Sequence, residues 1–255
     1  MIITSKSNPK IKQIALLKDK KFRKKSGTYV VEGFKMVSEA FSHGKEVQLL
    51  VGTEDALSRF DEFGVEKIAV SESVLSYVSD AVTPQGVLAV LKEDIKPLKS
   101  PDRPSVLLDG VADPGNLGTI IRTCVAVGVN DIYLVDCCDP FSPKAVRSSM
   151  SGIFFVNLYF LSRAEVSSVM QKTPIIVADM HGENVFSFNP PNAYCLVIGN
   201  EANGVSDTVK SLATHTVKIP MSDSIESLNA GVSLAITIYT LTEGKGKSLI
   251  SNKYN

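Results

Sequence analysis

The apolar and polar positions along the chain alternate between strand-like and helix-like spacing from one end to the other. In the first part, short apolar runs predict strands at residues 28–31, 47–52, 67–70 and 86–91. Between them, apolar residues at helical spacing predict helices at 34–42, 54–63 and 73–79. This order of elements is typical of a small α/β sandwich.

A proline-rich seam follows, with Pro97, Pro101 and Pro104 set among charged residues. Since proline resists both helix and strand, we predict a linker at residues 98–104. It would join a domain of residues 1–97 to a domain of residues 105–255.

The second domain contains near-continuous apolar runs, the pattern of parallel strands covered on both faces. The predicted strands lie at residues 105–109, 131–135, 175–178, 194–198 and 215–219. The sequence therefore predicts an α/β fold with a parallel sheet in this domain.

Composition narrows the class of protein. A chain of 255 residues with 44% hydrophobic content can bury a sizeable core. It has no run of about 18 apolar residues, and its N-terminus is Lys-rich, so we expect a cytoplasmic globular protein without a membrane span. The cysteines (Cys124, Cys137, Cys138 and Cys195) form no CxxC pair, and the histidines (His43, His181 and His215) are far apart. We predict no metal site.

The formal net charge is zero, but nine Lys or Arg against one Asp fall within residues 1–25. The densest stretch surrounds Phe22 and consists of Lys20, Lys21, Arg23, Lys24 and Lys25. Such a run favours contact with an RNA backbone. A solvated, frayed N-terminus is the alternative. Lys144 and Arg147 add two cations that could hold phosphates, or could belong to a solvated loop.

Three loops of the second domain carry candidate chemistry, and each follows a predicted strand. The first, residues 108–116, ends on Asn116 and enters a helix at 117–127 that Gly128 closes. Arg122 is the only charged residue of that helix, and a guanidinium among apolar neighbours needs an anionic acceptor. The alternative is a polar side facing solvent or an internal salt bridge.

The second loop, residues 199–204, combines Gly199 and Gly204 with two asparagines, which permits close approach of the backbone to a ligand. Glu201 is a candidate partner for Arg122. The loop could equally be an ordinary turn.

The third loop, residues 219–229, enters a helix at 230–242, where Ser227 and Asn229 either serve the site or cap the helix. No GxGxxG or GxxxxGK[ST] motif occurs, so a nucleotide site here would be of another kind.

Together the three loops resemble the SpoU, or TrmH-like, family of RNA ribose 2′-O-methyltransferases in the knotted SPOUT superfamily. Asn116 with Arg122 resembles the first motif, and Gly199, Glu201 and Gly204 resemble the second. The third motif is matched by residues 219–221 and 227–229. Residues 27–39 resemble the start of the family's ribosomal-protein-like substrate-binding domain. One departure is Ala-Gly-Val-Ser after Asn229, where many relatives have Val-Ser-Val-Ala.

The resemblance implies a trefoil knot, a homodimer, and S-adenosylmethionine bound in the knotted crevice. Backbone groups around Gly199, Ile219 and Leu228 would hold the adenosine part, with Ile198 and Met221 beside them. The apolar helix 117–127 would fit a subunit interface as well as a core.

A ribose hydroxyl is a poor nucleophile, whereas a sulfonium methyl is already activated, so the protein must align the two and favour the alkoxide. Because a guanidinium hardly loses its proton, we expect Arg122 to clamp a phosphate and stabilise oxygen charge. Asn116 and Asn229 would orient the ribose, Glu201 would fix Arg122, and Ser227 would support the pocket. No metal is required.

Two other functions compete with ribose methylation. A knotted methyltransferase acting on a base nitrogen would need an acidic base placed for a purine edge. A non-catalytic RNA-binding relative would lose the Asn116 and Arg122 pair or the cofactor loops, and neither is lost here. The separate N-terminal domain favours ribosomal RNA as substrate, with tRNA as the alternative; housekeeping and antibiotic-resistance roles both fit.

Overall fold

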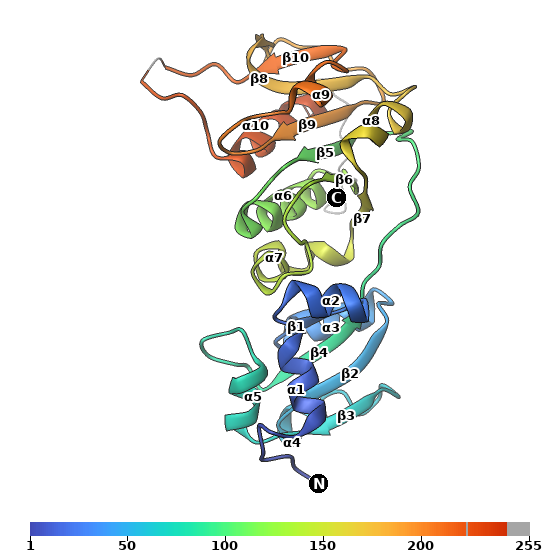
Figure 1. Cartoon of the computed structure of the whole chain (residues 1–255), viewed down its shortest axis with the longest axis vertical. Helices are drawn as coiled ribbons and strands as arrows, with labels where there is room; N and C mark the ends of the chain where they lie inside the picture. Colours follow the sequence, from blue (N-terminus) through green and yellow to red (C-terminus); the bar gives the residue numbers. More distant parts are fainter. Residues whose placement is uncertain (223, 244–255) are drawn as a thin grey trace, which may run out of the picture. The chain divides into compact units, whose positions relative to one another are not determined.

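The structure is a computed structural model that describes residues 1–222 and 224–243 (Figure 1). The chain divides into two compact units. The first contains residues 1–93 and 139–154, and the second contains residues 94–138 and the described residues from 155 onward.

The first unit has a four-stranded sheet of order β1-β4-β2-β3. Its strands are β1 (Thr28–Glu32), β2 (Val47–Gly52), β3 (Glu66–Ala69) and β4 (Val87–Lys92). β4 runs antiparallel to both β1 and β2, whereas β2 and β3 are parallel. All four strands were predicted from the apolar runs.

The helices of this unit are α1 (Pro9–Leu16), α2 (Lys20–Ser26), α3 (Phe34–Ser42), α4 (Glu54–Ser58), α5 (Glu72–Val78) and α7 (Pro143–Ser149), with a 3-10 turn η1 (Met150–Phe154). The helix predicted at 54–63 is too long. Beyond Ser58 the chain forms turns, and its apolar pattern continues because Phe60 and Phe63 pack on Phe41.

The basic N-terminal segment is helical, so its interpretation as a frayed end is wrong. α1 starts at the cap Asn8, whose side chain accepts a hydrogen bond from the backbone N–H of Lys10, and it buries Ile11 and Ile14. α2 starts at the cap Asp19 and ends at Gly27, where φ is +63°.

The described part of the second unit holds a six-stranded, fully parallel sheet of order β10-β8-β9-β5-β6-β7. Its strands are β5 (Ser105–Asp109), β6 (Asp131–Val135), β7 (Asn157–Phe160), β8 (Ile175–Asn184), β9 (Cys195–Gly199) and β10 (His215–Lys218). The predicted parallel sheet is confirmed. β7 was missed, because it is four residues long and lies in the stretch 153–161, where Asn157 alone interrupts the apolar residues and no strand period is visible.

The helices of this unit are α6 (Pro114–Ala126), α8 (Arg163–Val169), α9 (Asp207–Lys210) and α10 (Ala230–Glu243). α6 begins three residues before the predicted start, because Asp113 caps it by accepting a hydrogen bond from the backbone N–H of Asn116 at 2.9 Å. α6 packs against α10. Gly128 follows α6 with φ +75°, as predicted for its end.

The strand order reverses at β5. The next strand in the chain, β6, pairs with one edge of β5, and β9 pairs with the other edge. Ligands of open parallel sheets bind at the carboxyl ends of strands beside such a point. Two loops meet there, and the side chain of Asn200 after β9 donates to the carbonyl of Gly110 after β5, at 2.7 Å.

In the described part of the chain, no helix combines the length and apolar character that crossing a membrane requires. Likewise, residues 1–222 and 224–243 contain no group of three His, Cys, Asp or Glu side chains arranged to hold a metal ion.

Candidate active site

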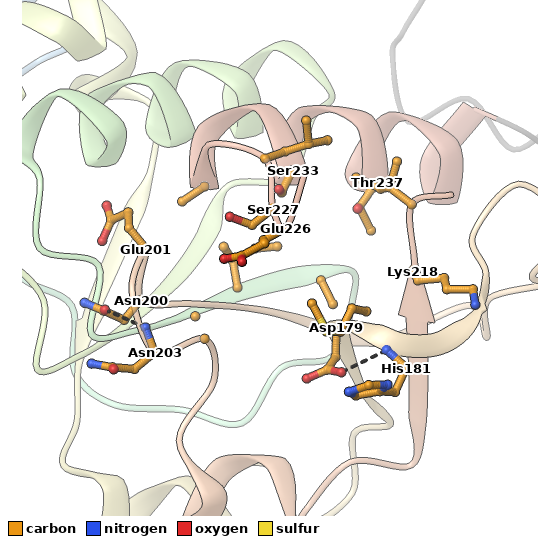
Figure 2. A pocket seen from close by; sticks show the side chains of 18 of the residues that line it. Asp179, His181, Asn200, Glu201, Asn203, Lys218, Glu226, Ser227, Ser233 and Thr237 are labelled. Atoms are coloured by element: carbon orange, nitrogen blue, oxygen red, sulfur yellow. Dashed lines mark hydrogen bonds between the residues drawn. The ribbon is translucent and has the colours of Figure 1, made fainter. Parts of the chain in front are cut away.

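A cavity of about 450 Å³ lies at the carboxyl ends of β9 and β10 and beside residues 178–181 in the middle of β8 (Figure 2). We call it the edge cavity. All five residues predicted to bind a cofactor line it: Ile198, Gly199, Ile219, Met221 and Leu228. Its volume lies in the range of sites that enclose small-molecule ligands.

The loop after β9 folds tightly because Gly199 has no side chain. A Cβ on Gly199 would lie 2.1 Å from the carbonyl carbon of Gly204 and 2.2 Å from the nitrogen of Val205. Asn200 and Gly204 exchange two backbone hydrogen bonds, each of 2.9 Å, and Gly204 has φ +67°. The two glycines of the predicted motif are therefore geometric requirements of this turn.

Three side chains from the three motif loops form one hydrogen-bond chain. Nδ2 of Asn229 donates to Oδ1 of Asn116 at 2.8 Å, and Nδ2 of Asn116 donates to Oε1 of Glu201 at 2.7 Å. The other carboxylate oxygen of Glu201 accepts from the backbone N–H of Ala112 at 3.3 Å. The structure thus brings together three of the five predicted catalytic residues.

The direction of this chain follows from its two ends. Oδ1 of Asn229 accepts from the backbone N–H groups of Gly231 and Val232, at 2.9 and 3.3 Å, so its amide group must point at Asn116. The carboxylate of Glu201 can only accept. Asn229 therefore caps α10 and orients the amide of Asn116 at once.

Glu201 is held as an anion. Partial burial raises the pKa of its carboxyl, but hydrogen bonds from Asn116 and from the backbone N–H groups of Ala112 and Asp113 outweigh burial and lower the pKa below its ordinary value. Its negative charge also lies at the N-terminus of α6, where the helix dipole favours an anion.

The expected pairing of Glu201 with Arg122 is absent from the part of the chain that the structure describes. Arg122 is exposed on α6 and makes no ion pair with a described residue. The reason is helical geometry, since six residues at about 100° each turn Arg122 roughly 120° around α6 from Asn116. Asn116 takes the place that we had expected Arg122 to fill beside Glu201.

Ser227 lines the edge cavity but does not cap α10, because Asn229 occupies the cap position. Ser227 is exposed and lies near Glu226 on the cavity side in Figure 2.

A buried carboxylate that the sequence interpretation missed supports the same loops. Asp109 ends β5 and is 1% exposed. It accepts from Nε of Arg163 at 3.1 Å and from the backbone N–H and hydroxyl of Ser206 at 2.8 and 2.5 Å. The signal was an Asp that closes a strand built around Val106, Leu107 and Leu108, because a buried carboxylate requires partners.

The predicted RNA-contacting residues of the first unit divide into two groups. Lys20, Lys21, Lys24 and Lys25 are exposed on α2. Arg23 is 3% exposed, so including it was wrong. Its guanidinium lies 2.7 Å from Asp139 and donates to the carbonyls of Leu17 and Lys18, which leaves it engaged inside the unit.

Lys144 and Arg147 lie on α7, which is a helix and not the loop considered as their alternative. Both side chains are exposed, and Arg147 pairs with Asp80.

Comparison with known proteins identifies both parts of the chain. The sequence model of the SpoU rRNA Methylase family matches residues 103–239. That of the MRM3-like substrate binding domain matches residues 8–89.

Two relatives match over most of their length. The 23S rRNA (guanosine(2553)-2′-O)-methyltransferase RlmP of Bacillus subtilis is 31% identical, over 94% of this chain and 98% of its own. The 23S rRNA (uridine(2479)-2′-O)-methyltransferase of Streptomyces viridochromogenes is 32% identical, over 88% of this chain and 86% of its own.

The fold agrees with solved structures. An AdoMet-bound rRNA methyltransferase from Sinorhizobium meliloti superposes with a TM-score of 0.87 and 28% identity, over 95% of this chain and 97% of its own. The SpoU methyltransferase AviRb from Streptomyces viridochromogenes, in complex with AdoMet, gives a TM-score of 0.84 and 29% identity, over 91% of this chain and 96% of its own. With the three motif loops converging on one cavity, these matches confirm the resemblance, and the chain belongs to the SpoU rRNA methylase family.

Proposed function

We propose that this protein transfers a methyl group from S-adenosylmethionine to a ribose 2′-hydroxyl in ribosomal RNA. The observation that carries the proposal is the hydrogen-bond chain from Asn229 through Asn116 to Glu201, which ties the three motif loops together beside the edge cavity. The relatives named above, which act on 23S rRNA at the 2′-oxygen, support the substrate.

The edge cavity fits the cofactor. Its volume suits a nucleoside derivative, and the close approach of Gly199 to Gly204 keeps the wall free of a side chain. Ile198, Ile219 and Leu228 supply apolar walls, while Gly199 and Met221 complete the lining. When bound, the cofactor supplies a methyl group already activated by its positive sulfur.

The residues of the chain orient the acceptor. Asn116 and Asn229 position the ribose, because their amides are fixed by Glu201 and by the first turn of α10. Glu201 is a poor proton acceptor, since its hydrogen bonds stabilise the anion. Arg122 clamps the neighbouring phosphate and stabilises charge on the oxygen, and Ser227 supports the pocket. The proton leaves to water or to a phosphate.

The same proposal includes a homodimer formed through α6 and α10. On α10, Val232 and Tyr239 are 46% and 41% exposed and lie seven residues apart, hence on one face. Arg122 is exposed on α6, which packs on α10. A second copy docked on these helices would bury apolar surface and change the surroundings of Arg122. Sedimentation of the parent and of a Tyr239→Glu variant tests this.

RNA recognition is proposed for residues 1–97, methyl transfer for residues 105–255, and the connection for residues 98–104. The compact units of the structure differ from these bounds, because residues 139–154 belong to the first unit and residues 94–97 to the second. Lys20, Lys21, Lys24 and Lys25 would follow the phosphate backbone, with Lys144 and Arg147 contacting further phosphates. We also propose that the methyltransferase domain contains a trefoil knot and that the protein works in the cytoplasm.

The decisive experiment uses total RNA from a strain that lacks the gene. The protein and labelled S-adenosylmethionine are added, and the labelled nucleotide is mapped. We expect a single 2′-O-methylated nucleotide in ribosomal RNA, resistant to alkaline cleavage at that linkage. An Asn116→Ala variant serves as the inactive control. A label on a base, or on tRNA alone, would contradict the proposal.

A further inference from the structure

One hydroxyl in the wall of the edge cavity has no partner among the residues that the structure describes. Thr237 lies on α10 and is 1% exposed, and its Oγ1 is buried without a hydrogen bond. Ser233, one turn earlier on the same helix face, also lines the cavity. Figure 2 shows both side chains on the side of α10 that faces the cavity.

The other threonines near the end of α10 behave differently. Oγ1 of Thr240 donates to the carbonyl of Ile236 at 2.8 Å, and Oγ1 of Thr242 donates to that of Ile238 at 2.7 Å. This bond to the preceding turn is the usual way in which a helix satisfies a threonine. Thr242 is as deeply buried as Thr237, at 3% exposed, so burial alone does not explain the unpaired hydroxyl.

An unpaired buried hydroxyl is costly, so one that lines a cavity indicates a ligand that completes it. The charged side chains that line the cavity are less deeply buried than Thr237. Glu201, Lys218 and Glu226 are exposed, and Asp179 pairs with Lys210 at 2.5 Å. A neutral, deeply buried hydroxyl suits a neutral polar group, since a charged group buried there would need a charged partner.

Resting on the proposed function, we propose that Oγ1 of Thr237 hydrogen-bonds the adenine ring of the cofactor. Adenine is the flat, neutral, polar part of S-adenosylmethionine, whereas the sulfur is positive and the amino-acid end carries an ammonium and a carboxylate. A hydroxyl can donate to a ring nitrogen or accept from the amino group, so it can satisfy either edge. Thr237 is thereby a binding residue of the cofactor site beyond the three family motifs.

The test is calorimetric titration of the full chain with S-adenosylhomocysteine and with 5′-methylthioadenosine, which lacks the amino-acid end. The variants are Thr237→Val, which removes the hydroxyl but keeps the shape, and Thr242→Val, the matched control. We expect Thr237→Val to weaken both ligands by about tenfold, the value of one neutral hydrogen bond. Thr242→Val should bind both like the parent, and Thr237→Ser should restore affinity.

A thermal melt separates binding from folding. Without ligand, Thr237→Val should melt at the parent's temperature or above it, because it removes an unsatisfied buried group. Parent-like affinity of Thr237→Val would overturn the inference. A loss seen with S-adenosylhomocysteine but not with 5′-methylthioadenosine would move the contact to the amino-acid end and overturn the adenine assignment. If the parent binds neither ligand, the cofactor assignment itself fails.

Discussion

Asn116 and Asn229 are hydrogen-bonded at 2.8 Å although they begin two different helices, α6 and α10. The bond joins the loop after β5 to the loop after β10, and Asn116 in turn donates a hydrogen bond to Glu201. Each of the two amides has one donor side and one acceptor side. Replacing either asparagine therefore leaves two donors or two acceptors facing each other at the neighbouring side chain.

Asn229→Asp separates the cap from the hydrogen-bond chain. The new carboxylate still caps α10, so the melting temperature should change little. It cannot donate to Asn116, whose amide would then turn its oxygen toward the carboxylate of Glu201. We expect methyl transfer to fall on the order of 100-fold, as for loss of one positioning group. Asn229→Ala, which also loses the cap, should in addition be less stable by about 1 kcal/mol. Equal activity of Asn229→Asp and the parent would exclude the positioning role.

Glu201 should be coupled energetically to Asn116 and not to Arg122. In a double-mutant cycle on methyl transfer, Glu201→Gln and Asn116→Ala share a hydrogen bond, so their losses should be non-additive. Glu201→Gln and Arg122→Ala should be additive, because the structure shows no contact between the two side chains. If the losses are additive for Glu201 with Asn116 but coupled for Glu201 with Arg122, the side chains rearrange when RNA binds.

Arg122→Lys distinguishes a phosphate clamp from a base. Lysine keeps the charge but loses the planar fork, so a clamp predicts a uniformly lower rate with the parent's pH dependence. A base predicts a rate that rises with pH through the pKa of the new lysine. We expect the first outcome, measured as single-turnover rates across the pH range. Full activity of Arg122→Ala on the correct RNA would exclude both the clamp role and the base role.

Gly199→Ala should damage the edge cavity. A Cβ there would lie 2.1 Å from the backbone of Gly204, so the loop must move. We expect at least about tenfold weaker binding of S-adenosylhomocysteine by calorimetry. Gly204→Ala is the control: its Cβ would meet nothing within 4 Å, and only the strain of φ +67° remains, about 1 kcal/mol. Comparable affinity losses in both variants would point to backbone strain instead of the clash.

Replacing Lys20, Lys21, Lys24 and Lys25 by Ala should weaken RNA binding and flatten its salt dependence. Each lost phosphate contact should lower the slope of log affinity against log salt by about 0.7 to 0.9. Affinity for S-adenosylhomocysteine should not change. Arg23 is left in place, because breaking its buried pair with Asp139 would cost about 3 kcal/mol of stability and obscure the result. An unaltered salt slope would assign α2 a purely structural role.

Glu93 should make stability depend on pH. Burial and the nearby carboxylate of Asp139 raise the pKa of Glu93 from 4.5 to about 7, with Arg23 and Lys24 partly opposing the shift. Because the folded state holds this proton more tightly, stability is lost as the pH rises from 4.5 through 7. Glu93→Gln should abolish that loss and raise stability above pH 7 by on the order of 1 kcal/mol. Melting curves at pH 5 and pH 8 check this; an unchanged pH dependence in the variant would contradict it.

The amino-acid sequence by itself determined where most strands run and which loops carry the motifs. Apolar runs such as 105–109 and 131–135 mark strands because a buried parallel strand must be apolar on both faces, a local property. Gly199 was identifiable for a similar reason, since a tight turn restricts the residue at that position wherever it lies in the fold.

Only the tertiary structure decided which side chains meet. The need of Arg122 for an anionic partner suggested Glu201, but the rotation of α6 presents Asn116 to Glu201 instead. The basic run at residues 20–25 grouped Arg23 with the exposed lysines. In the structure Arg23 is buried because it pairs with Asp139, which lies 116 residues away in the sequence. No sequence pattern around Thr237 distinguishes it from the other threonines of α10. Its hydroxyl is unpaired because of how α10 packs beside a cavity that distant strands form. Such contacts depend on the direction of each side chain in three dimensions, which local pattern does not encode.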